Sequence, residues 1–297
     1  MSSVRVNPNP LPDVLSSLEK LLQEQQTATL QLSTGSRINQ PSDDPAGAAQ
    51  LVEINASTSV VDSYQRSISS ISGELSTADS TLSSVVAALQ RAVSLGTEGA
   101  NGTLSDADRS DIAAELIGIQ SQLLSLANTS YQGQYIFAGT ANTQPFVLDS
   151  ASPSGVTYKG NSGTNSVTIG EGYSLRVNLP GAQIFNGANA DAFQAINDLI
   201  TGMQNNSGVG TAVTEVSNAI NYLSTQQAFY GNALNQAQAQ QTYLGSEQVN
   251  LSQESNTVSA ADVATVASQV SSDAIAVDAT LSAIGKLPQN SLFDYLK

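Results

Sequence analysis

The sequence contains no cysteine, no histidine and no tryptophan among its 297 residues. The lack of Cys and His excludes disulfides, Cys/His zinc sites, Fe–S clusters and catalysis that depends on a Cys or His side chain. Charged residues are also scarce, at 12% of the chain, which is about half the share of an ordinary soluble domain. The formal net charge of −15 disfavours binding to nucleic acid or to an anionic membrane, because both require a basic surface.

Targeting and membrane segments are missing as well. The first residues lack the apolar core of a secretory signal, and no run of about 18 apolar residues occurs anywhere. We therefore expect neither a signal peptide of this kind nor a membrane-spanning helix. Hydrophobic residues make up 40% of the chain, which is enough to form one or two packed domains.

Proline is absent from residues 46–144 and from residues 181–287. Because proline is the strongest helix breaker, this distribution predicts long helices in both stretches. It also predicts a short non-helical insert between them.

Apolar residues recur at alternating spacings of three and four in five segments: 11–32, 61–92, 112–126, 213–258 and 263–284. This spacing is typical of helices that pack in the manner of a coiled coil. The segments predict an antiparallel arrangement of long helices on both sides of the insert.

Short runs of alternating apolar and polar residues occupy the insert, at 156–158, 167–169 and 173–179, with glycines between them. Such runs predict β-strands joined by turns. Residues 191–204 predict a helix that leads back to the long helices. The expected fold class is mainly α: a long antiparallel helical rod or coiled coil that carries a small inserted β lobe.

Asp43 and Asp44 are the only adjacent acidic residues and thus a candidate metal site or acid–base pair. They precede Pro45, however, and this order is typical of a helix N-cap with proline at the first helical position. Ser105 with the acids in 106–111 is interpreted as a second cap, because the Gly and Glu that complete a calcium loop are absent. The serines have no His and no suitably spaced Lys as a base. We therefore expect no enzyme activity, no cofactor and no metal site.

Each of the five segments carries a stripe, or seam, of apolar side chains. The first and last seams, at 11–32 and 263–284, lie near the two ends of the chain and are narrow. Burial of the five large apolar residues of the first seam stabilises it by roughly 10 kcal/mol, whereas ordering its backbone costs about 1–2 kcal/mol per residue. We expect these helices to be loose in the monomer and to order against each other or against neighbouring subunits. The side chains predicted to make these contacts are Leu11, Val14, Leu18, Leu21, Leu32, Val263, Val266, Val270, Val277, Leu281 and Ile284.

Lysine and arginine are absent between Arg176 and Lys286. Helices in this stretch cannot be matched by salt bridges, and their glutamines offer amides that both donate and accept hydrogen bonds. We interpret this neutral surface as one suited to close packing among many copies of the chain, although solubility alone is an alternative reason.

Residues 32–39 read Leu-Ser-Thr-Gly-Ser-Arg-Ile-Asn, and Asp-Asp-Pro-Ala-Gly follows at 43–47. This pattern resembles the N-terminal signature of bacterial flagellins, and residues 89–103 and 261–281 are similar to further flagellin segments. The likeness covers everything except the insert. The signature residues are Arg37, Asn39, Asp43, Asp44, Pro45, Ala46 and Gly47.

Within that superfamily, the middle of the chain resembles the hook-associated protein 3 family more than the filament flagellins. The likeness lies in residues 128–140, with Phe137 and Gly139, and in Pro145 and Phe146. The ending at 291–296 is similar to the same family. A short filament flagellin is the alternative, and a cytosolic coiled-coil scaffold that mimics the motif is a third interpretation.

The resemblance implies a structural role at the hook–filament junction, where the chain adapts the lattice of hook-associated protein 1 to the flagellin filament. It implies a homo-oligomer in a helical or ring layer, with hook-associated protein 1, flagellin and an export chaperone as partners. The implied location is the extracellular flagellum, reached through flagellar type III export. In this organisation residues 1–44 and 258–297 form an inner coiled coil, 45–135 and 189–257 the helical rod core, and 136–188 the β domain.

Overall fold

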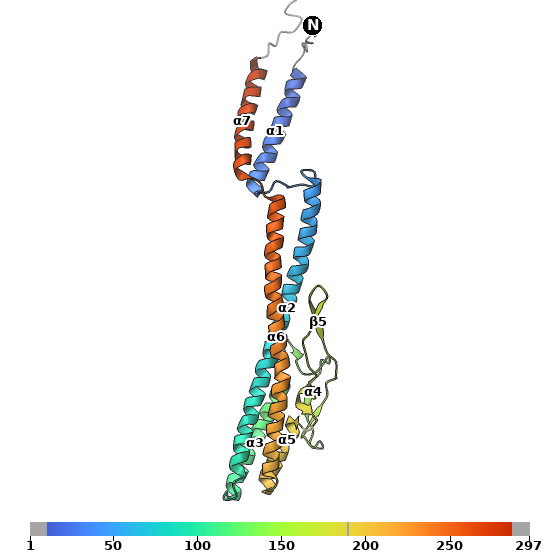
Figure 1. Cartoon of the computed structure of the whole chain (residues 1–297), viewed down its shortest axis with the longest axis vertical. Coiled ribbons are helices and arrows are strands. Elements are labelled where there is room, and N and C mark those ends of the chain that lie inside the picture. Colours follow the sequence, from blue (N-terminus) through green and yellow to red (C-terminus); the bar gives the residue numbers. More distant parts are fainter. Residues whose placement is uncertain (1–10, 189, 287–297) are drawn as a thin grey trace, which may run out of the picture. The chain divides into compact units, whose positions relative to one another are not determined.

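The computed structural model describes residues 11–188 and 190–286, and it is mainly α-helical (Figure 1). The described residues form two compact units: one contains those up to Ser59 and those from Gln248 onward, and the other contains those within Val60–Glu247. Helices α2 (Pro45–Gly99) and α6 (Val209–Ser259) contribute residues to both units. The predicted fold class, mainly α with small inserted β elements, is confirmed.

In the first unit, α1 (Leu11–Thr34) and α7 (Val263–Lys286) pack along each other. A short antiparallel bridge between Ser36 and Ala260 joins the chain just after α1 to the chain just before α7. The two helices therefore run in opposite directions, as the seams at the chain ends predict.

In the second unit, the apolar seam of α2 forms a helical core with α3 (Asp106–Ala127), α5 (Ala192–Asn205) and α6. Gly96 on α2 allows a close approach, because a Cβ there would lie 2.5 Å from a Val213 methyl group on α6. The fully buried seam side chains of α2 in this unit include Ile68, Leu75, Ala78, Leu82, Val85, Leu89 and Ala92.

The predicted cap before the third helix is confirmed. The Ser105 hydroxyl accepts a hydrogen bond from the backbone N–H of Asp108, and the Asp108 carboxylate accepts one from the backbone N–H of Ser105. This reciprocal arrangement is a capping box, and it accounts for the two polar residues without a calcium ion.

In the part that the structure describes, the insert contains four pairs of antiparallel strands and one short helix, α4 (Gly181–Phe185). The pairs are β1 (Ser130–Tyr131) with β2 (Gln134–Tyr135), β3 (Phe146–Leu148) with β4 (Val156–Tyr158), β5 (Ser166–Gly170) with β6 (Tyr173–Arg176), and β7 (Asn186–Gly187) with β8 (Ala190–Asp191). The predicted runs at 156–158 and 167–169 are strands.

The alternating run at 173–179 stays in a strand only as far as Arg176. Beyond it, the backbone N–H of Leu179 donates to the buried hydroxyl of Tyr230 instead of to a strand partner. The β elements also extend outside the expected limits of 136–188, because two-residue strands such as β1 and β8 are too short to carry an alternation pattern.

An aromatic cluster forms the core of the insert. Phe137, Phe146, Phe185 and Phe193 have no solvent exposure, and their ring centroids lie 5.2–5.8 Å apart in contacting pairs. Tilted and edge-to-face pairs of this kind stabilise a core beyond the simple burial of apolar area. Phe193 belongs to α5, so the cluster joins the insert to the helices of its unit.

Three hydrogen bonds hold the insert against α6. The Tyr222 hydroxyl donates to the Gln183 carbonyl at 2.7 Å, and the Tyr230 hydroxyl accepts from the Leu179 N–H at 3.2 Å. The Tyr173 hydroxyl of β6 donates to the side-chain oxygen of Gln236 at 2.9 Å. These contacts fix the insert at several points along one helix.

Among the described residues, no helix is long and apolar enough to span a membrane. Helices α5, α6 and α7 carry no basic side chain before Lys286.

Candidate functional site

The side chains predicted for assembly lie on the α1–α7 pair, and none of the eleven is fully buried. Leu11, Leu32, Val263 and Leu281 are exposed, and the other seven are half-buried. Within the described residues of the two helices, only Ala28 and Asp273 are buried. The pair therefore has no large apolar core of its own, and much of its apolar surface remains available.

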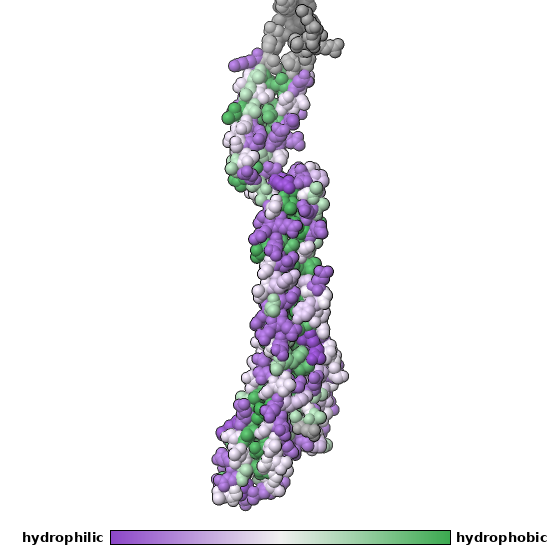
Figure 2. All heavy atoms as spheres, viewed as in Figure 1, coloured by the Kyte–Doolittle hydropathy of each residue, from purple (hydrophilic) through white to green (hydrophobic). Residues whose placement is uncertain are grey.

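Four further apolar side chains of the pair are exposed but do not lie at the predicted seam positions: Leu15, Leu22, Leu30 and Ile275. Ile275 is 71% exposed. The leucines are spaced seven and eight residues apart, which places them on one additional face of α1. The spacing of this second apolar stripe is the pattern from which these leucines could have been predicted. Figure 2 shows apolar side chains at the surface of the pair.

Asp273 is the other residue that the sequence analysis missed. Its spacing from Val270 and Val277 places it in the apolar seam, at a heptad position where that seam lacks an apolar residue. The structure buries it to 4% exposure, and only one of its oxygens has a hydrogen-bond partner, the side-chain amide of Gln269.

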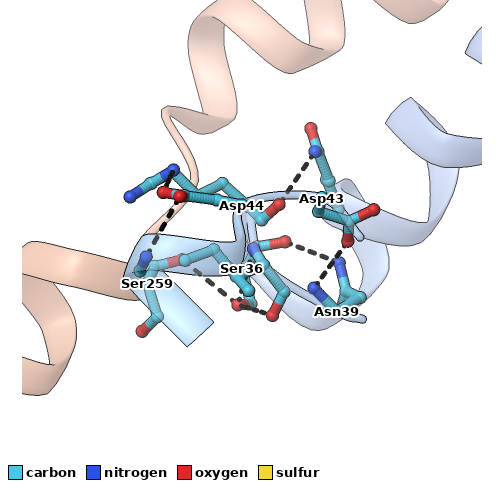
Figure 3. Close-up of polar contacts among 9 residues, drawn as sticks. Ser36, Asn39, Asp43, Asp44 and Ser259 are labelled. Carbon is cyan, nitrogen blue, oxygen red and sulfur yellow. Dashed lines mark hydrogen bonds and ion pairs between the residues drawn. The ribbon is translucent and has the colours of Figure 1, made fainter. Parts of the chain in front are cut away.

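The signature residues at 36–47 form a compact loop that joins the α1–α2 connection to the α6–α7 connection (Figure 3). The backbone N–H of Arg37 donates to the Ser259 carbonyl at 2.7 Å, and that of Ala261 donates to the Gly35 carbonyl at 2.9 Å. The Ser36 hydroxyl lies within hydrogen-bonding distance of the same Ser259 carbonyl, at 3.1 Å. These bonds link segments that are more than two hundred residues apart in sequence.

The two adjacent acids have different roles in this loop. One Asp43 oxygen accepts hydrogen bonds from the backbone N–H groups of Asn39 and Gln40, at 2.9 and 3.0 Å. These bonds hold the pKa of the Asp43 carboxyl below its usual 3.8, because they favour the ionised form. The Asn39 side chain closes the loop by donating to the Ser36 carbonyl.

Asp44 is the predicted N-cap of α2, and the structure confirms this interpretation. Its Oδ1 accepts from the backbone N–H of Gly47, and its Oδ2 accepts from the Arg37 guanidinium at 2.9 Å. The Gly47 hydrogen bond and then the Arg37 contact hold the pKa of Asp44 below its usual value. Pro45 occupies the first helical position, where its missing N–H costs nothing.

Gly47 leaves room for two neighbouring side chains. A Cβ at this position would lie 2.6 Å from Asp44 Oδ2 and 2.6 Å from the Ile38 side chain. The adjacent Ala46 is exposed, and nothing in the structure explains its place in the signature.

The motif residues in the insert belong to its core. Phe137, Pro145 and Phe146 are buried beside the other aromatic rings. Gly139 has a φ of 75° and a Cβ there would collide with Asn161, so both the backbone conformation and the space require glycine. The similar ending at 291–296 lies outside the described residues, as do parts of the two terminal segments.

The described residues contain no group of three His, Cys, Asp or Glu side chains positioned to hold a metal ion. What the structure brings together at the signature is a set of backbone hydrogen bonds and one exposed ion pair. Its evident effect is to connect helices rather than to present a reactive group.

Residues 13–142 match the family described as the bacterial flagellin N-terminal helical region. Over 165 residues the chain is 38% identical to flagellar hook-associated protein 3 of Salmonella typhimurium. The aligned region is 54% of this chain and 50% of that protein. The protein of the same name from Escherichia coli is 41% identical over 118 residues, or 39% of this chain and 37% of that protein. The chain thus spans half or less of the length of these relatives.

A solved structure of a flagellar hook-associated protein from Vibrio parahaemolyticus has a TM-score of 0.68 against this chain. It is 22% identical and covers 73% of this chain and all of its own length. At this identity the likeness establishes the fold. The matched N-terminal region and the sequence relatives show that part of the chain is similar to bacterial flagellins and to hook-associated protein 3.

Proposed function

We propose that the chain is a structural subunit of the hook–filament junction of the bacterial flagellum. The observation that carries this proposal is the 38% identity to a hook-associated protein 3 over 165 residues. In this role the chain makes and breaks no covalent bond. It adapts the lattice of hook-associated protein 1 to that of the flagellin filament.

The terminal helix pair supports an assembly role. Its eleven seam side chains are at most half-buried, and a second leucine stripe on α1 is exposed. Exposed apolar side chains in this number are typical of a protein–protein interface. Neighbouring copies in a helical or ring layer would complete the burial that the isolated pair lacks.

The proposal divides the chain by role. Residues 1–44 and 258–297 would form the inner coiled coil, 45–135 and 189–257 the helical rod core, and 136–188 the outer β domain. Hook-associated protein 1 and flagellin would be the neighbours in the assembly, with an export chaperone before secretion. The location would be extracellular, after passage through the flagellar type III system.

A deletion strain of the source bacterium tests the junction role directly. We expect hooks to persist while flagellin is lost unpolymerised into the medium, and motility to return on complementation with the intact gene. Electron microscopy of the cells and immunoblotting of the medium measure both outcomes. Filaments of normal length in the deletion strain would rule out the proposal.

A short filament flagellin is the second candidate, and the match to the flagellin N-terminal region favours it. The two roles differ in copy number, because a junction needs about one helical layer and a filament needs thousands of subunits. Quantitative mass spectrometry of sheared flagella, referenced to a hook protein, separates them. A copy number comparable to that of the major filament protein would favour the flagellin role.

A further inference from the structure

The sequence contains two Asn-Gly pairs, Asn101-Gly102 in the α2–α3 connection and Asn186-Gly187 in β7. An asparagine side chain that precedes glycine can lose its amide group without an enzyme, because the backbone nitrogen of the glycine approaches it without hindrance from a side chain. Both asparagines are exposed, so access of water does not distinguish them. Their hydrogen bonds differ, however, and so does the space around the two glycines.

The hydrogen bonds of Asn101 favour this reaction. Its Oδ1 accepts from the backbone N–H of Thr103 at 3.2 Å and from the Thr103 hydroxyl at 2.9 Å. Two donors on this oxygen polarise the side-chain carbonyl, and they stabilise the negative charge that the oxygen gains when a nucleophile attacks the carbon. The loop therefore holds a small oxyanion hole at the side chain of Asn101.

The attacking nitrogen next to Asn101 is free. Among the described residues, no acceptor receives a hydrogen bond from the Gly102 N–H. A Cβ on Gly102 would have no atom within 4 Å, so the space around this backbone is open. The turn itself is held on both sides, because the Asn101 N–H donates to the Glu98 carbonyl at 3.1 Å and the Leu104 N–H donates to the Asn101 carbonyl at 3.2 Å.

Asn186 is held in a different way. Its Nδ2 donates to Asp191 Oδ2 at 2.9 Å, and the other oxygen of that carboxylate caps α5. Gly187 packs against Tyr222, since a Cβ on this glycine would lie 2.5 Å from the tyrosine ring. Pairing of β7 with β8 further fixes the backbone of both residues. The side chain must therefore break a charge-assisted hydrogen bond before it reacts, and the glycine has little freedom to approach it.

We propose that Asn101 is a site of spontaneous deamidation assisted by Thr103, and that the fold protects Asn186. The Gly102 nitrogen forms a bond to Asn101 Cγ and gives its proton to water. The bond from Cγ to Nδ2 then breaks, and Nδ2 takes up a proton and leaves as ammonia, so that a cyclic succinimide remains. Water opens this ring at either of its carbonyls and yields aspartate or isoaspartate. In total one water is consumed and one ammonia is released, with no oxidation or reduction.

The products change the charge and the backbone of the loop. Each adds a negative charge to a chain whose formal net charge is already −15. Isoaspartate also routes the main chain through the side chain, so the carbonyl that accepts from the Leu104 N–H leaves the backbone. The Leu104 carbonyl accepts from the buried Arg109 guanidinium at 2.7 Å, so this change occurs beside the first turn of α3. The reaction needs no flagellar partner and is independent of the proposed assembly role.

Incubation of the purified full-length chain at mildly alkaline pH, followed by peptide mass spectrometry, tests the proposal. Trypsin releases Asn101 within residues 92–109, and chymotrypsin releases Asn186 within residues 186–193. We expect Asn101 to convert at least about tenfold faster than Asn186 in the folded chain, the ratio that corresponds to one or two hydrogen bonds. In urea both sites lose their surroundings and should convert at similar rates.

Three variants and a control test the chemistry at Asn101. Thr103→Val removes the hydroxyl and should slow the conversion by about twofold to tenfold, the effect of one neutral hydrogen bond, whereas Thr103→Ser should keep the original rate. Gly102→Ala should also slow it, and alanine fits the open space there, so the slower rate does not come from misfolding. Thr97→Val removes a hydroxyl that bonds only to the Val93 carbonyl on α2 and should have no effect.

Two results would overturn the proposal. One is conversion of Asn101 in urea but not in the folded chain, because the fold would then protect this site rather than promote its reaction. The other is an equal rate at Asn101 and Asn186 in the folded chain. An unchanged rate in Thr103→Val would refute the assistance by the hydroxyl.

Discussion

The side-chain amide of Asn128 pairs with the backbone of Phe146 as a neighbouring strand would. Its Nδ2 donates to the Phe146 carbonyl at 2.8 Å, and its Oδ1 accepts from the Phe146 N–H at 2.9 Å. Asn128 is also the C-cap of α3, so one residue ends a helix and aligns the first residue of β3. The buried Phe146 ring is thereby positioned in the aromatic cluster of the insert.

Substitution Asn128→Ala should destabilise the Val60–Glu247 unit by about 1–3 kcal/mol, because the Phe146 N–H loses its acceptor and the Phe146 carbonyl keeps only the side-chain donor of Gln144. Urea unfolding followed by tyrosine fluorescence reports on this unit, since every tyrosine within the described residues lies in it. Asn142→Ala, at an exposed position nearby, is the control. Equal unfolding midpoints for the two variants would contradict the pairing.

Tyr230→Phe should also weaken this unit, by about 1–3 kcal/mol, because it leaves the buried N–H of Leu179 without an acceptor. Tyr230 has no solvent exposure, and its burial raises the pKa of the hydroxyl. Tyr243→Phe on the same helix is the matched control, since that side chain is 61% exposed. Thermal unfolding by circular dichroism compares the two, and a Tm unchanged in both variants would count against the hydrogen bond.

Gly47→Ala should disrupt the signature loop, although the helical backbone at residue 47 suits alanine. The added methyl group would lie 2.6 Å from both Asp44 Oδ2 and the Ile38 side chain, so the ion pair with Arg37 must move. We expect a loss of about 1–3 kcal/mol, typical of overpacking. Gly245→Ala on α6 meets no atom within 4 Å and should instead stabilise by about 0.5–1 kcal/mol. The measurement is the change in Tm of each variant relative to the unchanged chain. Changes of the same sign in both variants would argue against the close contact.

The loop should loosen in acid. Asp43 and Asp44 have pKa values below 3.8 in the folded chain, because hydrogen bonds favour their ionised forms. Their contribution to the stability of the folded loop is therefore complete above pH 3.8, and it is lost as the pH falls through the lowered pKa values. NMR titration of the amides of Asn39 and Gly47 should show midpoints below 3.8. Midpoints above that value would mean that these bonds do not form in solution.

The α1 helix should exchange its amide hydrogens faster than the α2 segment 61–95. The α2 seam is buried at nearly every position, whereas among the described residues of α1 only Ala28 is buried. Opening of α1 therefore exposes little apolar surface and costs little free energy. Hydrogen exchange of the monomer measures both segments in one experiment, and equal protection would contradict the looseness expected of the terminal pair.

The helices were predictable from the sequence because their signals are local. The seam at 61–92 has an apolar residue at every expected position, and proline stays outside it. The Asp44 cap was equally clear, because Pro45 marks the helix start. In each case the residues that determine the structure lie within a few turns of one another.

Contacts between distant segments were not predictable in this way. Tyr230 has the spacing of an ordinary seam residue, and nothing in that spacing predicts its hydrogen bond to Leu179, which lies beyond the end of β6. The link from Arg37 to Ser259 joins two loops that carry no shared pattern. Asp273 did leave a local sign, a missing apolar residue in the heptad, but that sign alone does not predict its burial.

The lack of basic side chains in α5, α6 and α7 before Lys286 has a practical consequence for proteolysis. Trypsin cleaves after lysine and arginine, so the chain from Val177 to Lys286 offers it no internal site, folded or unfolded. A complete digest leaves all three helices on one long peptide. Peptide mapping of this part of the molecule therefore needs an enzyme that cleaves at aromatic or acidic residues.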